Sequence, residues 1–394
     1  MEVREVQLRR LPTSQGLLVD GQLVTQAPLN DPSGPVVLFE RVNEAEAHPA
    51  LPALFYRYYH DGSQGTNSSD GFISGLFTGS RAGFPPPPAT PDQMLYHYVK
   101  AHINRNHIHS PFISVCITLN WVIRQALQAQ SRDETNPRIC VIDASIAGRN
   151  RKAFYPGPYH REIKKYRPYE NGAQLYSGTY EFLIWGNIPK EAIICDFPLS
   201  HLREHVDGIP ELSSMLGFDI LSQHRRSFRN VILPQLQARN VQVKPSIIPA
   251  MASLATFLGI DATSPAAYIS KVVADIIEGW GIRPSIDSWA AWYDKAKLFA
   301  IYLSTISMSG PFDQKETAEA FLAGARAGLG QYDWFRFPSK ERTVNTRASR
   351  VGLGAVVGGI KPREFYQVLV DHGADLKASR QRDMVRSFRY RGES

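Results

Sequence analysis

The pattern of apolar residues changes about halfway along the 394-residue chain, and this change constrains the fold more than any other feature. Up to about residue 205, short apolar runs alternate with stretches rich in Gly, Pro, Ser and Tyr, which is typical of β-strands joined by loops. After Pro210 the apolar residues recur at helical intervals almost to the end, separated by Gly and Pro. The sequence therefore predicts an α+β domain followed by an all-α domain.

Three regions follow from this pattern. Residues 1–48 hold short alternating runs broken by Pro and Gly, which predict a β-rich extension. Residues 49–207 form the expected α+β domain, and residues 208–394 form the helical domain with an arginine-rich tail. A hydrophobic fraction of 43% and a charged fraction of 21% are typical of a globular protein, so we expect a sizeable core.

The spacing of apolar residues, and the Gly and Pro residues that interrupt it, place the expected elements along the chain. In the α+β region we expect a helix over 118–130, a loop over 155–178, and strands over 54–59, 111–115, 139–146, 180–185 and 192–197. In the last region we expect helices over 211–240, 249–258, 264–280, 286–308 and 313–329.

Three polar residues in the α+β region have unusual surroundings. Arg57 lies within an aromatic strand, where a guanidinium must reach the strand edge or meet an anion. Ser114 ends a strand before a helix, a place where serine is most often a turn or cap residue. Glu181 interrupts a strand that is apolar on both sides, so its carboxylate faces a polar site or has a raised pKa. Taken alone, Arg57 is as compatible with a structural role as with a functional one, and Ser114 favours the structural role.

In this order, the three residues resemble the Arg–Ser–Glu class of ADP-ribosyltransferases, which includes the cholera- and pertussis-type toxins. That class carries an Arg on its first strand, a Ser-Thr-Ser-like motif where a strand leads into a helix, and a Glu followed by Gly-x-Ile-Pro-x-x-x-Ile. The corresponding parts here are Arg57, PFIS at 111–114, and Glu181 followed by GNIPKEAI at 186–193. The likeness covers residues 50–205 and is closest to fungal proteins that carry such a domain.

The resemblance implies a split β-sandwich fold and an enzyme that cleaves the nicotinamide–ribose bond of NAD, its co-substrate, and transfers ADP-ribose. Arg57 would anchor NAD, Ser114 would order the site, and Glu181 would stabilise positive charge on the ribose. These residue types suit a pyrophosphate dianion and an oxocarbenium-like transition state. Two further NAD contacts are implied: the backbone at Tyr58, and His60, because another class uses a His on the first strand.

The resemblance leaves the acceptor open, whether a protein, a nucleic acid or a small molecule. It places the acceptor loop before Glu181, with Tyr169, Tyr176 and Thr179 as candidates. Thr179 stands where arginine-directed members carry Glu, and the serine motif continues as Val115 and Cys116 instead of hydroxyl residues. Two alternatives therefore stay open. One is an NAD glycohydrolase on the same fold, and the other is a catalytically silent binding module.

No metal site is expected. The three cysteines, Cys116, Cys140 and Cys195, lie in apolar stretches without metal-type spacing. Three clustered histidines lack the Cys or carboxylate partners of a metal site; these are His102, His107 and His109.

The net charge of +7 is compatible with an anionic partner, and part of it lies in the last fifteen residues. The arginines of this tail are Arg380, Arg382, Arg386, Arg389 and Arg391. We expect no membrane partner, because no apolar run reaches the length of a membrane span and the N-terminus lacks the apolar segment of a signal peptide. This pattern predicts a cytoplasmic protein, although secretion without a leader would leave the same pattern.

Overall fold

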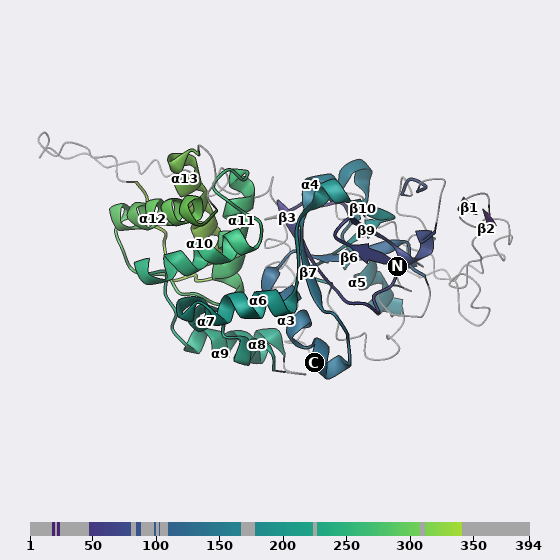
Figure 1. The fold of residues 1–394 in the computed structure, drawn as a ribbon, viewed down its shortest axis with the longest axis horizontal. Coiled ribbons are helices and arrows are strands. Elements are labelled where there is room, and N and C mark those ends of the chain that lie inside the picture. The colour runs from purple at the N-terminus through teal and green to yellow at the C-terminus, as the bar shows by residue number, and fades with distance from the viewer. Residues whose placement is uncertain are drawn as a thin grey trace, which may run out of the picture. The chain divides into compact units, whose positions relative to one another are not determined.

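A computed structural model gives the fold (Figure 1). It describes residues 18–19, 22–23, 47–79, 84–87, 98–99, 102, 109–166, 178–223, 227–307 and 312–340. The chain divides into two compact units, of which the first comprises residues 1–49 and 54–199 and the second residues 50–53 and 200–394. In the predicted N-terminal extension, β1 (Leu18–Val19) pairs antiparallel with β2 (Gln22–Leu23).

The first unit is built on a six-stranded, wholly antiparallel sheet with the strand order β11-β7-β3-β6-β9-β8. Its strands are β3 (Leu54–Tyr59), β6 (Phe112–Cys116), β7 (Arg138–Asp143), β8 (Ala153–Phe154), β9 (Glu181–Trp185) and β11 (Ile193–Pro198). Aromatic and β-branched residues dominate β3 and β9, and such side chains pack well on a pleated surface. The predicted mixed α/β character is confirmed.

A second, three-stranded sheet has the order β10-β5-β4. Its strands are β4 (Thr66–Ser68), β5 (Gly71–Ile73) and β10 (Asn187–Pro189). Gly186, with φ +76°, lets the chain turn directly from β9 of the large sheet into β10 of the small one. The chain then returns through the 3₁₀ turn η6 (Lys190–Ala192) to β11 of the large sheet. The run GNIPKEAI is therefore the segment that joins the two sheets.

Two helices of the first unit differ from the sequence-based expectation. Residues 144–146 were expected to continue a strand but belong to α4 (Ala144–Ala147), because the Asp143 carboxylate caps this helix by accepting bonds from the amides of Ser145 and Ile146. The expected loop 155–178 contains α5 (Gly157–Tyr166). Its glycine and proline lie in the first turn, where proline needs no backbone hydrogen bond.

The core of the first unit lies around Trp185, whose ring is fully buried. Phe77, Tyr98 and Phe112 pack against this ring with centroids 5.7–6.3 Å away. The amphipathic helix α3 (Leu119–Leu127) packs on β3 and β7 through its buried apolar residues. Sheet and helix thereby fix the backbone positions of β3, β6 and β9.

The second unit is helical over its described residues, as predicted (Figure 1). The predicted helices correspond to α10 (Ile248–Phe257), α11 (Ala266–Gly279), α12 (Trp289–Ser307) and α13 (Gln314–Leu329). Gly324 and Gly328 let α13 approach the backbone of α11, because an added Cβ would lie 2.4 Å from the carbonyl of Ser270 and 2.8 Å from that of Ala274. These two helices are therefore packed at a distance that only glycine permits.

The single helix expected over 211–240 is wrong. The chain forms α7 (Pro210–Leu216), α8 (Phe218–Leu221), the π-helical turn η7 (Phe228–Ile232) and α9 (Leu233–Ala238), and α6 (Leu199–Asp207) precedes them. Gly217 adopts left-handed backbone angles, φ 55° and ψ 58°, and these angles end α7.

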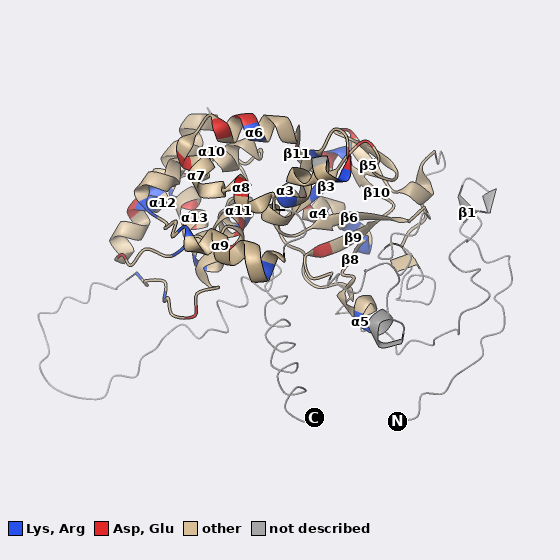
Figure 2. Ribbon diagram, turned by 90° about the horizontal axis from the view of Figure 1, so that it is seen from below, with Lys and Arg blue, Asp and Glu red and all other residues tan. Residues whose placement is uncertain are grey.

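Charge is mixed on the helices of the second unit, where basic and acidic residues are interspersed (Figure 2). The arginine-rich tail expected to meet an anionic partner lies outside the described residues. Within the described part, none of the helices combines the length and the apolar character that a membrane span needs.

Candidate functional site

The large sheet is nearly divided between β3 and β6. β3 pairs with β7 over all six of its residues and β6 pairs with β9 over all five, whereas β3 and β6 pair at a single position, Tyr56 with Cys116. The sheet thus consists of two three-stranded halves that meet at one residue pair. Beyond that pair, the facing edges of β3 and β6 carry no further ladder.

Arg57, the residue after this pair, connects the two halves through its side chain. Its Nη1 donates to the backbone carbonyl of Ser114 on β6 at 2.7 Å, and its Nη2 donates to Oδ1 of Asn67 on β4 at 2.7 Å. The side-chain amide of Asn67 in turn donates to the carbonyls of Ser63 and Gln64, at 3.2 and 3.1 Å. One guanidinium therefore holds β6, β4 and the loop after β3 together.

The charge on Arg57 is buried without a carboxylate in ion-pair contact. The residue is 8% exposed, its Nε has no hydrogen-bond partner, and its guanidinium takes part in none of the ion pairs between described residues. Burial lowers the pKa of Arg57 to about 10, although nearby acidic groups, those of Cys140, Tyr59 and Glu181, oppose the shift. The guanidinium is thus a cation at neutral pH. A buried cation without an ionic partner is costly, so this position favours an anionic ligand.

Glu181 lies one strand beyond Ser114. It pairs with Cys116 across β6 and β9, and Cys116 pairs with Tyr56 across β3 and β6, so Tyr56, Cys116 and Glu181 form one row across three strands. Neighbouring strands are about 4.8 Å apart. The half-buried Glu181 carboxylate is close enough to act on the Arg57 charge. The structure therefore brings Arg57, Ser114 and Glu181 together on adjacent strands.

The hydroxyl of Ser114 contacts a residue that the sequence analysis set aside. His102 Nε2 lies 2.7 Å from Ser114 Oγ, and His102 Nδ1 lies 2.8 Å from Oγ of the buried Ser110. The described residues contain no group of three or more His, Cys, Asp or Glu side chains able to hold a metal ion. His102 lies twelve residues before Ser114 and outside β6, so no local periodicity in the sequence indicates that the two side chains meet.

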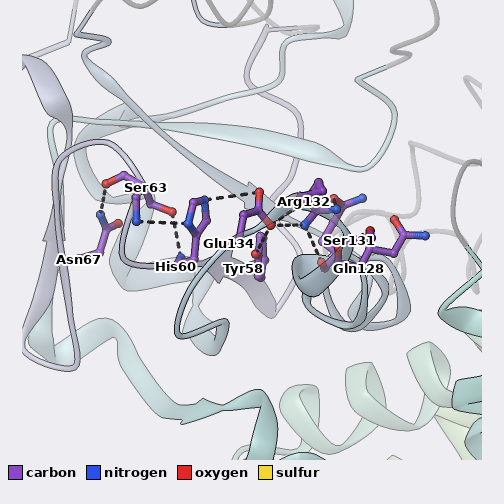
Figure 3. A network of polar contacts seen from close by, with 10 residues as sticks. Tyr58, His60, Ser63, Asn67, Gln128, Ser131, Arg132 and Glu134 are labelled. Atoms are coloured by element: carbon purple, nitrogen blue, oxygen red, sulfur yellow. Dashed lines mark hydrogen bonds and ion pairs between the residues drawn. The ribbon is translucent and has the colours of Figure 1, made fainter.

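Tyr58 and His60, the other predicted NAD contacts, direct their side chains to Glu134 (Figure 3). The Tyr58 hydroxyl donates to Glu134 at 2.6 Å, and His60 Nε2 lies 3.6 Å from the same carboxylate. Arg132 forms an ion pair with Glu134 at 2.6 Å and lies over the Tyr58 ring. These side chains form a network with one another, so the predicted NAD contacts at Tyr58 and His60 have side chains that already contact partners within the protein.

The Glu134 network predicts a pH-dependent contribution to stability. Burial favours a higher pKa for Glu134, but hydrogen bonds from Arg132 and Tyr58 outweigh it and lower the pKa in the folded state. A lowered folded-state pKa stabilises the protein above the unfolded value of about 4.3. We therefore expect Glu134→Gln to reduce the free energy of unfolding by about 1–2 kcal/mol at pH 7, as measured by urea denaturation. The difference from the wild type should shrink as the pH falls below about 4.

Asp133→Asn is the matched control for this prediction, since Asp133 is the exposed neighbour and asparagine tolerates its positive φ of 54°. A Glu134→Gln deficit that stays constant down to pH 3 would contradict an ionic role for Glu134.

The remaining candidates lie around β9. Thr179 is half-buried and precedes Glu181 by two residues, whereas Tyr169 and Tyr176 lie outside the described residues. None of the three cysteines forms a disulfide. Burial raises the pKa of Cys195 to about 11 and raises that of Cys140 well above its ordinary value, so neither thiol suits a nucleophilic role.

Comparison with known proteins adds one match. A family model described as a domain of unknown function, DUF7587, matches residues 50–202. The matched range contains β3, β6 and β9 and ends within α6, so it includes the three strands of the candidate site. No curated protein matches the chain.

Proposed function

We propose that the first unit is a split β-sandwich ADP-ribosyltransferase-type domain that cleaves the nicotinamide–ribose bond of NAD and transfers ADP-ribose to an acceptor. The observation that carries this proposal is the position of Arg57. It is a buried cation without a carboxylate in contact, it lies where β3 and β6 separate, and Glu181 is on the next strand but one. A dianionic pyrophosphate joined to a ribose that develops positive charge matches these two groups.

Each of the three residues has a role in the proposed cleavage of the nicotinamide–ribose bond. The bond between the nicotinamide nitrogen and the ribose C1′ breaks, its electron pair leaves with nicotinamide, and C1′ becomes oxocarbenium-like. The Glu181 carboxylate stabilises this charge, while the Arg57 guanidinium fixes the anionic part of NAD. The acceptor nucleophile then bonds to C1′ and loses its proton. Ser114, held through its carbonyl by Arg57, orders the strand between them.

An NAD glycohydrolase is the second candidate, and Thr179 favours it. In the resembling class, the residue at this position positions the acceptor, and arginine-directed members carry Glu there. A threonine has no carboxylate to accept the proton of a guanidinium acceptor. Water would then attack C1′ and release free ADP-ribose.

Product analysis tests the proposal and separates the two candidates. The full chain is incubated with NAD and a cell extract, nicotinamide release is measured by chromatography, and mass spectrometry follows the ADP-ribose. Labelled macromolecules support the transferase, and free ADP-ribose alone supports the glycohydrolase. An absence of nicotinamide release from the wild type would overturn both and favour a silent binding module.

Thr179→Glu provides a prediction about the acceptor. With agmatine as a small guanidinium acceptor, we expect this variant to raise the ratio of ADP-ribosyl-agmatine to free ADP-ribose by about tenfold or more, because a positioned general base contributes about 10²–10⁴-fold. Thr179→Gln has a similar shape without the charge and should change the ratio much less. Equal ratios in the two variants would exclude residue 179 from acceptor activation.

A further inference from the structure

A chain of hydrogen bonds runs from the backbone of β6 to the hydroxyl of Ser114. The Phe112 amide donates to Ser110 Oγ at 3.1 Å, Ser110 Oγ contacts His102 Nδ1 at 2.8 Å, and His102 Nε2 contacts Ser114 Oγ at 2.7 Å. The Phe112 ring packs edge-on against the imidazole, with centroids 5.9 Å apart and planes at 85°. Both ring nitrogens of His102 therefore contact serine hydroxyls, that of Ser110 just before β6 and that of Ser114 within it.

The imidazole determines the direction of hydrogen bonding at Ser114. A neutral imidazole has one donor nitrogen and one acceptor nitrogen. One serine hydroxyl therefore accepts a hydrogen bond from the ring, and the other donates one to it. With the proton on Nδ1, His102 donates to Ser110 and accepts from Ser114, whose oxygen then keeps its lone pairs for a ligand. With the proton on Nε2, the Ser114 hydroxyl is left to donate. The imidazole thus fixes the hydroxyl hydrogen in the first case and leaves it available to a ligand in the second, and in both cases it holds the position of the Ser114 oxygen.

Ser114 is thus held at two points, through its carbonyl by Arg57 and through its hydroxyl by His102. The next residues, Val115 and Cys116, supply no hydroxyl, so within the described part of the chain the Ser114 hydroxyl makes its side-chain hydrogen bond to His102 alone. We propose that His102 is a positioning residue that fixes the Ser114 hydroxyl toward a polar group of NAD. This inference rests on the proposed function, and it adds a residue of a different element to the site.

Two conservative variants separate the two bonds of His102. A glutamine amide reaches the position of Nε2 and keeps the contact to Ser114, whereas an asparagine amide reaches only the position of Nδ1 and keeps the contact to Ser110. We expect His102→Asn to lower kcat/KM for nicotinamide release by about tenfold, mainly through KM, as expected for the loss of one hydrogen bond. His102→Gln should stay within about threefold of the wild type.

A double-mutant cycle and an unrelated histidine serve as controls. Ser114→Ala should match His102→Asn, and the double variant should be no worse than Ser114→Ala, because both remove the same contact. His109→Asn, at an exposed histidine of the same region, should leave kcat and KM unchanged. If His102→Asn does not fold in thermal unfolding, Ser110→Ala with Ser114→Ala forms the second cycle, and non-additive effects on KM are expected there too.

The outcomes distinguish this inference from the proposed function. A wild type that neither binds nor cleaves NAD overturns the proposed function itself. A wild type that cleaves NAD, together with equal effects of the Asn and Gln variants or additive effects in the cycle, overturns the role of His102 alone.

Discussion

Glu181→Gln should lower the rate of nicotinamide release by about 10²–10³-fold, the usual loss when one preorganised group that stabilises transition-state charge is removed. Glutamine keeps the shape of the side chain, and Glu181 is only half-buried at the start of β9, so the fold should be retained. The charge opposite the ribose is lost, and this charge matters most when C1′ becomes positive. The loss should therefore fall on kcat, with KM for NAD within about threefold of the wild type.

Nicotinamide chromatography under single-turnover conditions measures this effect. Glu191→Gln is the matched control, because it removes an exposed carboxylate of the same unit at η6 and should leave the rate unchanged. A Glu181→Gln rate within threefold of the wild type would show that this carboxylate does not act on the reacting bond.

Arg57→Lys should affect both the fold and the proposed activity. The guanidinium bonds Ser114 and Asn67 at once, and a lysine ammonium is a point charge that cannot span both acceptors in the same geometry. Losing a hydrogen bond from a charged group costs about 1.5–3 kcal/mol, so we expect urea unfolding to report a loss of this size. Affinity for NAD should fall about 100-fold, because the fork that suits a phosphate is also lost.

Arg138→Lys separates the two effects of the Arg57 substitution. Arg138 makes a similar fork on the β7–β11 side of the sheet, to Tyr59 at 2.9 Å and Asp196 at 2.7 Å. Its replacement should lower stability but leave NAD affinity within about threefold. If both lysine variants lowered NAD affinity alike, the effect of Arg57→Lys would be one of stability only.

The sequence was sufficient for elements whose pattern is local. The aromatic run of β3 and the helical periodicity of α10 to α13 predicted the bounds of these elements to within three residues. It was not sufficient where one residue decides the local backbone. Asp143 caps a helix inside an expected strand, and Gly217 breaks an expected long helix. In each case a single capping or left-handed residue outweighed the apolar pattern around it.

For the site, the chain order Arg57, Ser114 and Glu181 was enough to indicate three residues that lie on adjacent strands. Asn67 and His102 were missed, because their hydrogen bonds to Arg57 and Ser114 depend on how separate segments are brought together. A polar residue in a Ser- and Asn-rich loop has no pattern that distinguishes a ligand of arginine from an ordinary turn residue.

A crystal structure of the Glu181→Gln variant briefly soaked with NAD would test the central claim most directly, since the variant should cleave the nicotinamide–ribose bond about 10²–10³-fold more slowly. The account predicts NAD where β3 and β6 separate, with its pyrophosphate or adjoining ribose on the Arg57 side and the ribose C1′ facing residue 181. NAD bound elsewhere, or no NAD at saturating concentration while Arg57 stays in contact with Ser114 and Asn67, would contradict it.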